Sequence, residues 1–207
     1  PQAVSETAAT SHFPYVLSVG DQNFVTWVEP PTATYETEIG TGETRLISSP
    51  VALVDAQPRL AASTDRLHSV FSAGPANIPD IYHASRPLIG SWTAAERVYT
   101  STASRGSWWP ALAADPGSGT LHAVWENKSA SMQKIMYISG TVSGADVGWS
   151  PVITLSTGIT RSIFPDIAVD SAGNVHVVWG EIGEQGYREY VRYTRYDAAS
   201  GSWIMPP

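Results

Sequence analysis

FPDIAVDSAGNVHVVW, residues Phe164–Trp179, is the most regular stretch of the chain and reads as one β-hairpin. A short apolar run ends at Asp170, a Ser-Ala-Gly-Asn turn follows, and a second run rich in β-branched residues ends in tryptophan. The same pattern returns at residues 109–125, more loosely at residues 58–71, and again at residues 13–27. The chain is therefore predicted to repeat one antiparallel unit along its length.

The spacing of the repeats indicates the architecture. The prolines that open them, Pro14, Pro58, Pro110 and Pro165, are separated by 44, 52 and 55 residues. A period of about 50 residues with several short strands per unit is typical of β-propeller blades. We therefore predict an all-β propeller with four four-stranded blades per chain. As a single domain over residues 1–207, its blade repeats are expected at residues 13–56, 57–106, 107–161 and 162–207, the last together with residues 1–12.

The two ends of the chain are predicted to meet. Residues 1–12 resemble residues 151–163, which are expected to form the fourth strand of the third unit and the loop after it. The fourth unit has no comparable outer strand before the chain ends. We expect the N-terminal strand to complete the C-terminal blade, because an open ring leaves unpaired sheet edges. Two arrangements stay open, a closed four-bladed ring and a homodimer in which exchanged strands join two chains into eight blades.

Composition and charge limit the possible partners. The chain has 12 basic and 19 acidic residues, a formal net charge of −7, which argues against nucleic acid because phosphate binding needs a basic face. It has no apolar run of about 18 residues, so no membrane span is predicted. It has no cysteine, which excludes disulfides and thiolate metal sites. A tryptophan-rich β-protein without cysteine is compatible with an extracellular or secreted bacterial protein.

The repeat pattern has a counterpart in a known family. Pro-x-[Ile/Leu]-Ala-x-Asp, then Gly, then [Val/Leu]-His-x-Val-Trp, at residues 110–125 and 165–179, resembles the BNR-type repeats of bacterial sialidase-like propellers. The Asp-box of that family, Ser-x-Asp-x-Gly-x-x-Trp, is absent, since Ala113 and Ala168 stand two residues before the aspartates. The [Phe/Tyr]-Arg-[Ile/Val]-Pro motif of family sialidases is also absent. The resemblance implies a propeller fold and no catalytic residue.

Two kinds of side chain recur on the second strand of the units. His68, His122 and His176 share one position and are interpreted as core or interblade histidines, so neither a metal site nor a cofactor is predicted. An aromatic residue ends the same strand in every unit. It is expected to fill the gap between blades, with sugar stacking as the alternative role. These residues are Trp27, Phe71, Trp125 and Trp179.

Chain direction places two sets of loops, those before the first strand and those after the second strand of each unit, on one face. Charged and aromatic side chains on the loops of a rigid scaffold are typical of a ligand face, although ordinary polar loops look similar. The candidate ligand-binding residues on this face are Arg105, Trp108, Arg161, Glu29, Glu126 and Glu181. Tyr187 and Arg188 open a dense run of Tyr and Arg that is either a binding surface or an outer strand.

Three functions follow from this sequence. The first is a non-catalytic binding or interaction propeller that presents its loop face to a glycan or protein partner. The second is a lectin-like propeller, which the recurring Glu29, Glu126 and Glu181 support. The third is a sialidase-like glycoside hydrolase, which needs two carboxylates about 5–9 Å apart. Glu126 and Glu181 are the candidates for that pair, and no catalytic residue is assigned.

Overall fold

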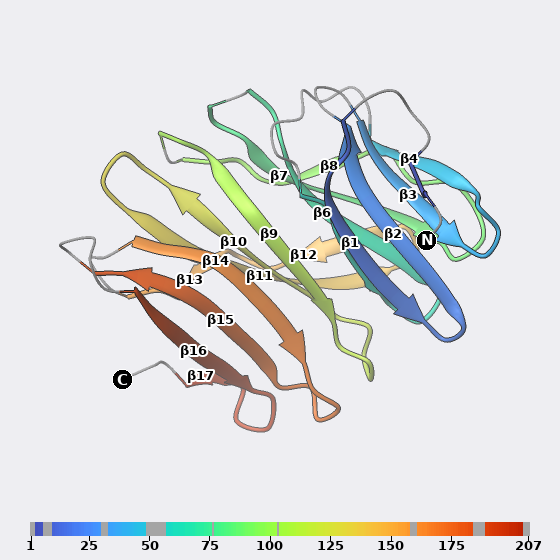
Figure 1. The fold of residues 1–207 in the computed structure, drawn as a ribbon. Coiled ribbons are helices and arrows are strands. Elements are labelled where there is room, and N and C mark those ends of the chain that lie inside the picture. Colours follow the sequence, from blue (N-terminus) through green and yellow to red (C-terminus); the bar gives the residue numbers. More distant parts are fainter. Residues whose placement is uncertain are drawn as a thin grey trace.

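The protein is built of β-strands alone within the part of the chain that a computed structural model describes (Figure 1). The described residues are 3–5, 10–29, 33–48, 57–75, 77–102, 104–157, 161–183 and 189–204. Among them, no helix is long and apolar enough to cross a membrane.

The strands form four successive antiparallel meanders. Meander 1 consists of β1 (His12–Val19), β2 (Gln22–Glu29), β3 (Ala33–Ile39) and β4 (Thr44–Ser48). Meander 2 consists of β5 (Arg59–Ala62), β6 (Arg66–Ala73), β7 (Asp80–Pro87) and β8 (Glu96–Tyr99). Meander 3 consists of β9 (Ser107–Ala114), β10 (Leu121–Lys128) and β11 (Gln133–Ser143), to which both β12 (Asp146–Trp149) and β13 (Ile153–Thr154) pair. Meander 4 consists of β14 (Arg161–Val169), β15 (Val175–Ile182), β16 (Glu189–Asp197) and β17 (Ser202–Ile204).

The meanders follow one another along an open arc. Meanders 1 and 2 are separate four-stranded sheets, whereas a parallel bridge between Gln133 and Arg161 joins meanders 3 and 4 into one nine-stranded sheet. The first strands β1, β5, β9 and β14 are neighbours in that order. Meander 1 and the N-terminus lie at one end of the arc, and meander 4 and the C-terminus lie at the other (Figure 1). The sheets therefore do not close into a ring.

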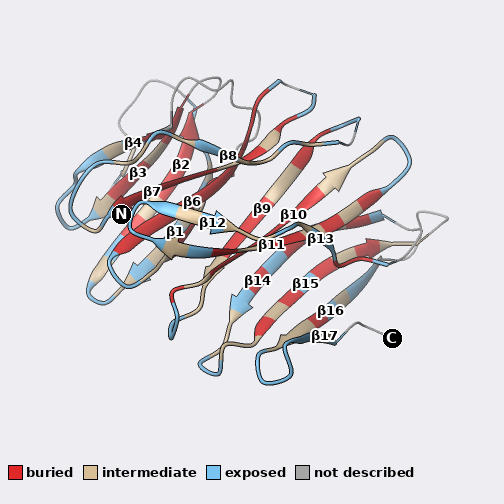
Figure 2. Cartoon of the chain, turned by 180° about the vertical axis from the view of Figure 1, so that it is seen from behind, coloured by how far each residue is buried: buried red, intermediate tan, exposed pale blue. Residues whose placement is uncertain are grey.

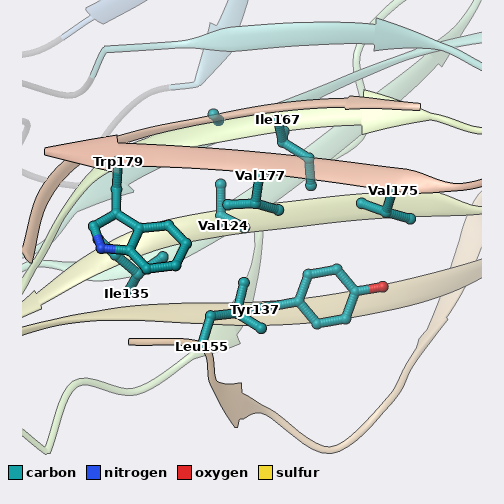
Figure 3. Packing of buried hydrophobic residues seen from close by; sticks show 9 residues of the cluster. Val124, Ile135, Tyr137, Leu155, Ile167, Val175, Val177 and Trp179 are labelled. Carbon is teal, nitrogen blue, oxygen red and sulfur yellow. The ribbon is translucent and has the colours of Figure 1, made fainter. Parts of the chain in front are cut away.

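The hydrophobic core lies between successive meanders. The aromatic residues that end the second strands of meanders 2, 3 and 4 are buried at junctions, as expected from their place in the repeat, whereas Trp27 of meander 1 lies on the opposite side from the first junction. In Figure 3, Trp179 and Val177 of β15 pack against Val124 and Ile135 of meander 3. Phe71 and Trp125 occupy the earlier two junctions. Burial of these large side chains makes each meander depend on its neighbour for a core.

The predicted closure by the N-terminal strand is wrong. The outer position of meander 4 is taken by β17, which pairs with β16 from Asp197 to Arg195. The described N-terminal residues lie against meander 1 instead, where Ser5 Oγ donates a hydrogen bond to Glu29 Oε1 at 3.2 Å. A strand of three residues has too little alternation to be detected in sequence, so the fourth unit looked incomplete.

The recurring histidines form hydrogen-bonded ladders across the strands. His122 Nδ1 lies 2.7 Å from the Tyr137 hydroxyl, and His176 Nδ1 lies 2.8 Å from the Tyr193 hydroxyl. In meander 2 the partner is another histidine, His83, whose Nε2 lies 3.1 Å from His68 Nδ1. Within the described residues, no group of three or more His, Cys, Asp or Glu side chains is arranged to hold a metal ion. The ladders tie neighbouring strands together.

These buried histidines predict an acid-sensitive fold. Burial lowers the pKa of His68 to about 3 and of His122 to about 4. Both imidazoles stay neutral in the folded protein but take up a proton in the unfolded chain below about pH 6.5. The free energy of unfolding should therefore fall as the pH drops below this value, by up to about 1.4 kcal/mol per pH unit for each histidine. Urea unfolding between neutral pH and about pH 5 measures this slope, and His122→Gln should make it shallower. If the free energy of unfolding of His122→Gln fell equally steeply with pH, His122 would not contribute to the acid sensitivity.

A buried ion pair joins meander 1 to meander 2. Arg86 donates from Nη2 to Glu36 Oε1 at 2.9 Å and from Nε to Glu36 Oε2 at 3.2 Å, and both side chains are fully buried. The Trp92 indole donates to the same carboxylate at 3.2 Å. The charge of Arg86 is therefore balanced across the junction by Glu36.

Removing the charge of Glu36 should destabilise the protein. Glu36→Gln keeps the size of the side chain but leaves the Arg86 guanidinium buried without its counter-charge, so we expect a loss of about 3 kcal/mol in the free energy of unfolding. The matched control is Glu43→Gln, because Glu43 is exposed and pairs with Arg45 at the surface. That change should cost less than about 0.5 kcal/mol. Equal losses in the two variants, measured by urea unfolding, would refute this account of the junction.

Candidate functional site

Three aromatic residues share an unusual backbone conformation. Phe13, Trp109 and Phe164 have φ angles of 53°, 54° and 52°, and each directly precedes the proline that opens a repeat. Gln57 takes the same place in meander 2, with φ of 40°. Left-handed φ is uncommon for residues other than glycine and costs on the order of 1 kcal/mol or more. The same strain at the same place in each meander fixes the direction of these side chains.

A β-bulge accompanies each of the three aromatic residues. The register between the first two strands shifts around Phe13, around Trp109 and around Phe164. A bulge re-aims a side chain away from the regular alternation of its strand. We refer to Phe13, Trp109 and Phe164 as the aromatic row.

The aromatic row gathers where the first strands β1, β5, β9 and β14 begin, which we call the inner edge of the arc. The Trp109 and Phe164 rings meet edge to face with centroids 4.9 Å apart, and the Phe13 and Trp109 rings do so at 6.1 Å. Phe13 belongs to meander 1 and Trp109 to meander 3, so their contact shows that the first strands converge where they begin. Phe164 is 57% exposed, and the other two rings are half-buried. The fold thus presents an aromatic surface to solvent.

Polar side chains directly follow three of the four prolines that open the repeats, Pro14, Pro58 and Pro165. They are Tyr15, Arg59 and Asp166. The Arg59 guanidinium lies over the Tyr15 ring at 4.9 Å from its centroid. Burial raises the pKa of Tyr15, with the Arg59 charge opposing the shift and the Asp166 charge adding to it. Because Asp166 of meander 4 acts on Tyr15 of meander 1, these groups lie near each other across the inner edge. Arg59 Nε is buried without a hydrogen-bond partner in the described part of the chain.

The three glutamates predicted for the ligand face are all buried. Glu29 accepts a hydrogen bond from the Trp27 indole at 3.1 Å, and Glu181 accepts one from Arg192 Nη2 at 3.0 Å. These carboxylates are thus engaged inside the protein.

Glu126 occupies a different register from the other two glutamates. It directly follows Trp125, whereas Glu29 and Glu181 stand two residues after their tryptophans, so its side chain points to the opposite face of the sheet. Burial raises the pKa of Glu126, and Lys128 at 3.8 Å and hydrogen bonds from Gln133 and the Phe164 backbone oppose that shift. Glu126 thus helps to hold the strained backbone of the aromatic row.

The remaining predicted site residues are distributed around meander 3. Arg161 Nε donates to Gln133 Oε1, which connects it to the Glu126 cluster. The Trp108 indole donates to the carbonyl oxygen of Arg105, whose side chain is exposed. Glu181 lies in meander 4 and pairs with Ser162, the residue after Arg161, whereas Glu29 lies in meander 1. Tyr187 and Arg188 fall outside the described residues.

The aromatic row and its polar neighbours are the part of the site that the sequence interpretation missed. The available signal was the recurring dipeptide of an aromatic residue and proline, Phe13-Pro14, Trp109-Pro110 and Phe164-Pro165. Proline disfavours the right-handed helical region for the residue before it, which marks these positions as special. In the sequence this pattern indicates the repeat period and does not by itself locate a site.

A pocket of about 560 Å³ opens on the side of meander 1 that no other meander covers. Trp27, Glu29 and Tyr35 line it together with Ala3 and Val4 of the N-terminal segment. The Trp27 and Tyr35 rings stack with centroids 5.7 Å apart. The pocket lies on the outer side of the first sheet, away from the aromatic row.

Comparison with known proteins identifies the fold. No family model and no curated protein matches the chain. Among solved structures it is similar to an α-L-arabinanase from Penicillium chrysogenum complexed with arabinobiose, with a TM-score of 0.63 and 18% identity over 94% of this chain and 66% of the other. It is also similar to an intramolecular trans-sialidase from Ruminococcus gnavus, with a TM-score of 0.62 and 12% identity over 93% of this chain and 44% of the other.

A third similar structure is the NanB sialidase from Streptococcus pneumoniae, with a TM-score of 0.60 and 11% identity over 79% of this chain and 26% of the other. This chain therefore spans less than half the length of the sialidases it matches. At these identities the likeness concerns the fold alone. The chain has an all-β fold similar to that of propeller glycoside hydrolases.

Proposed function

We propose that the protein binds carbohydrate at the inner edge of the arc, with the aromatic row as the stacking surface. The observation that carries this proposal is the convergence of Phe13, Trp109 and Phe164, each held in left-handed backbone at the same place of its meander. The C–H faces of sugar rings pack well on aromatic rings. The left-handed backbone brings three exposed or half-exposed rings to one place, which supports a ligand surface there.

The polar groups beside the row complete the chemistry of a sugar site. Sugar hydroxyls need hydrogen-bond partners that fix their orientation next to the stacking surface. The half-buried Arg59 guanidinium lies over the Tyr15 ring, and Asp166 is exposed next to Phe164 and Pro165. Arg105, Trp108 and Arg161 of the predicted loop face are proposed as outer contacts around this centre.

The similar structures support a carbohydrate ligand. An arabinanase, a trans-sialidase and a sialidase are by name carbohydrate-active proteins, and the arabinanase structure contains arabinobiose. A secreted location, as predicted from the composition, suits a protein that meets polysaccharide outside the cell.

We infer a binding role without hydrolysis. A glycoside hydrolase needs two carboxylates about 5–9 Å apart at the scissile bond. Glu126 and Glu181, the pair that the sequence suggested, are buried and already hydrogen-bonded inside the protein. Asp166 is the carboxylate exposed beside the aromatic row.

The variant Phe164→Asn separates ligand binding from stability. Asparagine tolerates left-handed φ, so the bulge is kept while the ring is lost. We expect affinity for the glycans that the wild type selects on an array to fall about tenfold, from loss of roughly 1 kcal/mol or more of stacking. The melting temperature should change by less than about 4 °C. Arabinobiose and 3′-sialyllactose are the first probes for calorimetry.

The matched control for Phe164→Asn is Tyr190→Ala, which removes an aromatic side chain that is also exposed but lies on β16, outside the row. This variant should bind like the wild type. Unchanged binding by Phe164→Asn, or a wild type that selects no glycan, would refute the proposed function.

Assays of hydrolysis test the non-catalytic part of the proposal. Fluorogenic sialosides and arabinofuranosides should show no turnover by the wild type beyond that of Asp166→Asn, because no free pair of carboxylates is present at the described inner edge. Turnover by the wild type that is lost in Asp166→Asn would show instead that the protein is an enzyme.

A further inference from the structure

Each meander has two different faces. The second-strand aromatic points toward the preceding meander, and the recurring histidine points toward the following one. We call the first the leading face and the second the trailing face. The three junctions in the arc each join one trailing face to the next leading face. The leading face of meander 1 and the trailing face of meander 4 are left without a neighbouring meander.

The trailing face of meander 4 repeats the buried trailing face of meander 3. Val178 pairs with Tyr193 in meander 4 in the same register as Val124 pairs with Tyr137 in meander 3. Each tyrosine bonds the histidine of its own ladder, at 2.8 Å and 2.7 Å. Val124 and Tyr137 are buried by meander 4, whereas Val178 and Tyr193 are exposed. Meanders 3 and 4 thus have similar trailing faces, of which that of meander 3 is buried and that of meander 4 is exposed.

The contrast in exposure is largest two pairs further along the strands, on the same face. Val191 of meander 4 is 83% exposed, and Ile135 at the equivalent place in meander 3 is fully buried. Ile204 of β17 is also exposed on the trailing face. Figure 2 shows exposed segments on β14 and β16 at this end of the arc and on β1 at the other. A cluster of exposed apolar side chains on one sheet face is typical of an interaction surface.

The leading face of meander 1 likewise lacks a neighbouring meander. Trp125 and Trp179 are packed against preceding meanders, whereas Trp27 lines the pocket of about 560 Å³. Beside this pocket, Ile39 and Leu46 are exposed on the same face. A hollow thus remains where the other junctions place a neighbouring sheet.

We propose that the trailing face of meander 4 binds the leading face of meander 1 of a second copy of this chain. The partner is identified by continuity with the three junctions inside the arc, because each of them joins these same two kinds of face. One chain does not satisfy both faces itself, since they lie at opposite ends of the arc (Figure 1). In a pair of chains, the trailing face of each one contacts the leading face of the other, so two junctions cover all four free faces.

This association differs from the strand-exchanged homodimer predicted from the sequence. The outer position of meander 4 is already filled by β17, so no strand needs to be donated. The contact is made by sheet faces, and the hydrogen-bonded ladders of each chain stay intact. The proposal does not rest on the proposed carbohydrate site, because the aromatic row lies at the inner edge.

The test is the mass of the protein in solution, measured by sedimentation over a range of concentrations. We expect the wild type to have the mass of two chains. Val191→Asp on the trailing face and Leu46→Asp on the leading face should each weaken association by about tenfold or more, because each places a carboxylate in an apolar contact. The matched control is Met132→Asp, since Met132 is 43% exposed in the turn before β11 of meander 3 and belongs to neither face. Circular dichroism verifies that every variant is folded.

Mixing the two interface variants distinguishes a head-to-tail contact from a symmetric one. Val191→Asp keeps an intact leading face and Leu46→Asp keeps an intact trailing face, so a mixture should recover a two-chain species through one good junction. A single-chain mass for the wild type at all concentrations would overturn the proposal. So would normal association of Leu46→Asp, which would indicate two trailing faces in contact, or equal weakening by Met132→Asp.

Discussion

Face-to-face packing between successive meanders is the constraint on which the structure depends. A four-stranded meander has no core of its own, so it becomes stable only when one of its faces is covered. The protein meets this need with a bulky aromatic side chain at the end of each second strand, Phe71, Trp125 or Trp179, which fills the wedge between two splayed sheets. Everything else in the fold is arranged around these junctions, including the exposed faces at the two ends of the arc.

The inner edge follows from the same packing. Where sheets fan out from a common line, the beginnings of their first strands are brought together, and residues far apart in sequence become neighbours. Phe13 and Trp109 are almost a hundred positions apart along the chain, yet their rings meet. The proline after each aromatic residue and the bulge around it direct the side chain toward the shared centre. The scaffold thereby turns one local motif into a composite surface.

Buried charge explains why acidic residues recur without forming an open site. Glu36 balances Arg86 inside the first junction, and Glu181 balances Arg192 within meander 4. Glu126 receives a backbone hydrogen bond from Phe164 in the next meander. Glu36 and Glu126 thus connect neighbouring meanders, and Glu181 connects two strands of one meander, because leaving either partner unpaired in a desolvated place is costly. Recurrence in the sequence therefore marked buried positions, and the residues exposed at the inner edge are different ones.

The sequence by itself determined the repeated strands, because alternation of apolar and polar residues, turn residues and strand-end aromatics are local signals. The strands expected around Pro110 and Pro165 agree with β9, β10, β14 and β15, and Phe71, Trp125 and Trp179 occupy the junctions as predicted, whereas Trp27 does not. Tertiary structure alone decided three other matters: that β17 and not the N-terminus completes meander 4, that Glu29, Glu126 and Glu181 are buried, and that the aromatic row converges. The pairing of β17 is local but too short to be detected in the sequence, whereas the burial of the glutamates and the convergence of the aromatic row depend on contacts between strands that the order of neighbouring residues does not specify.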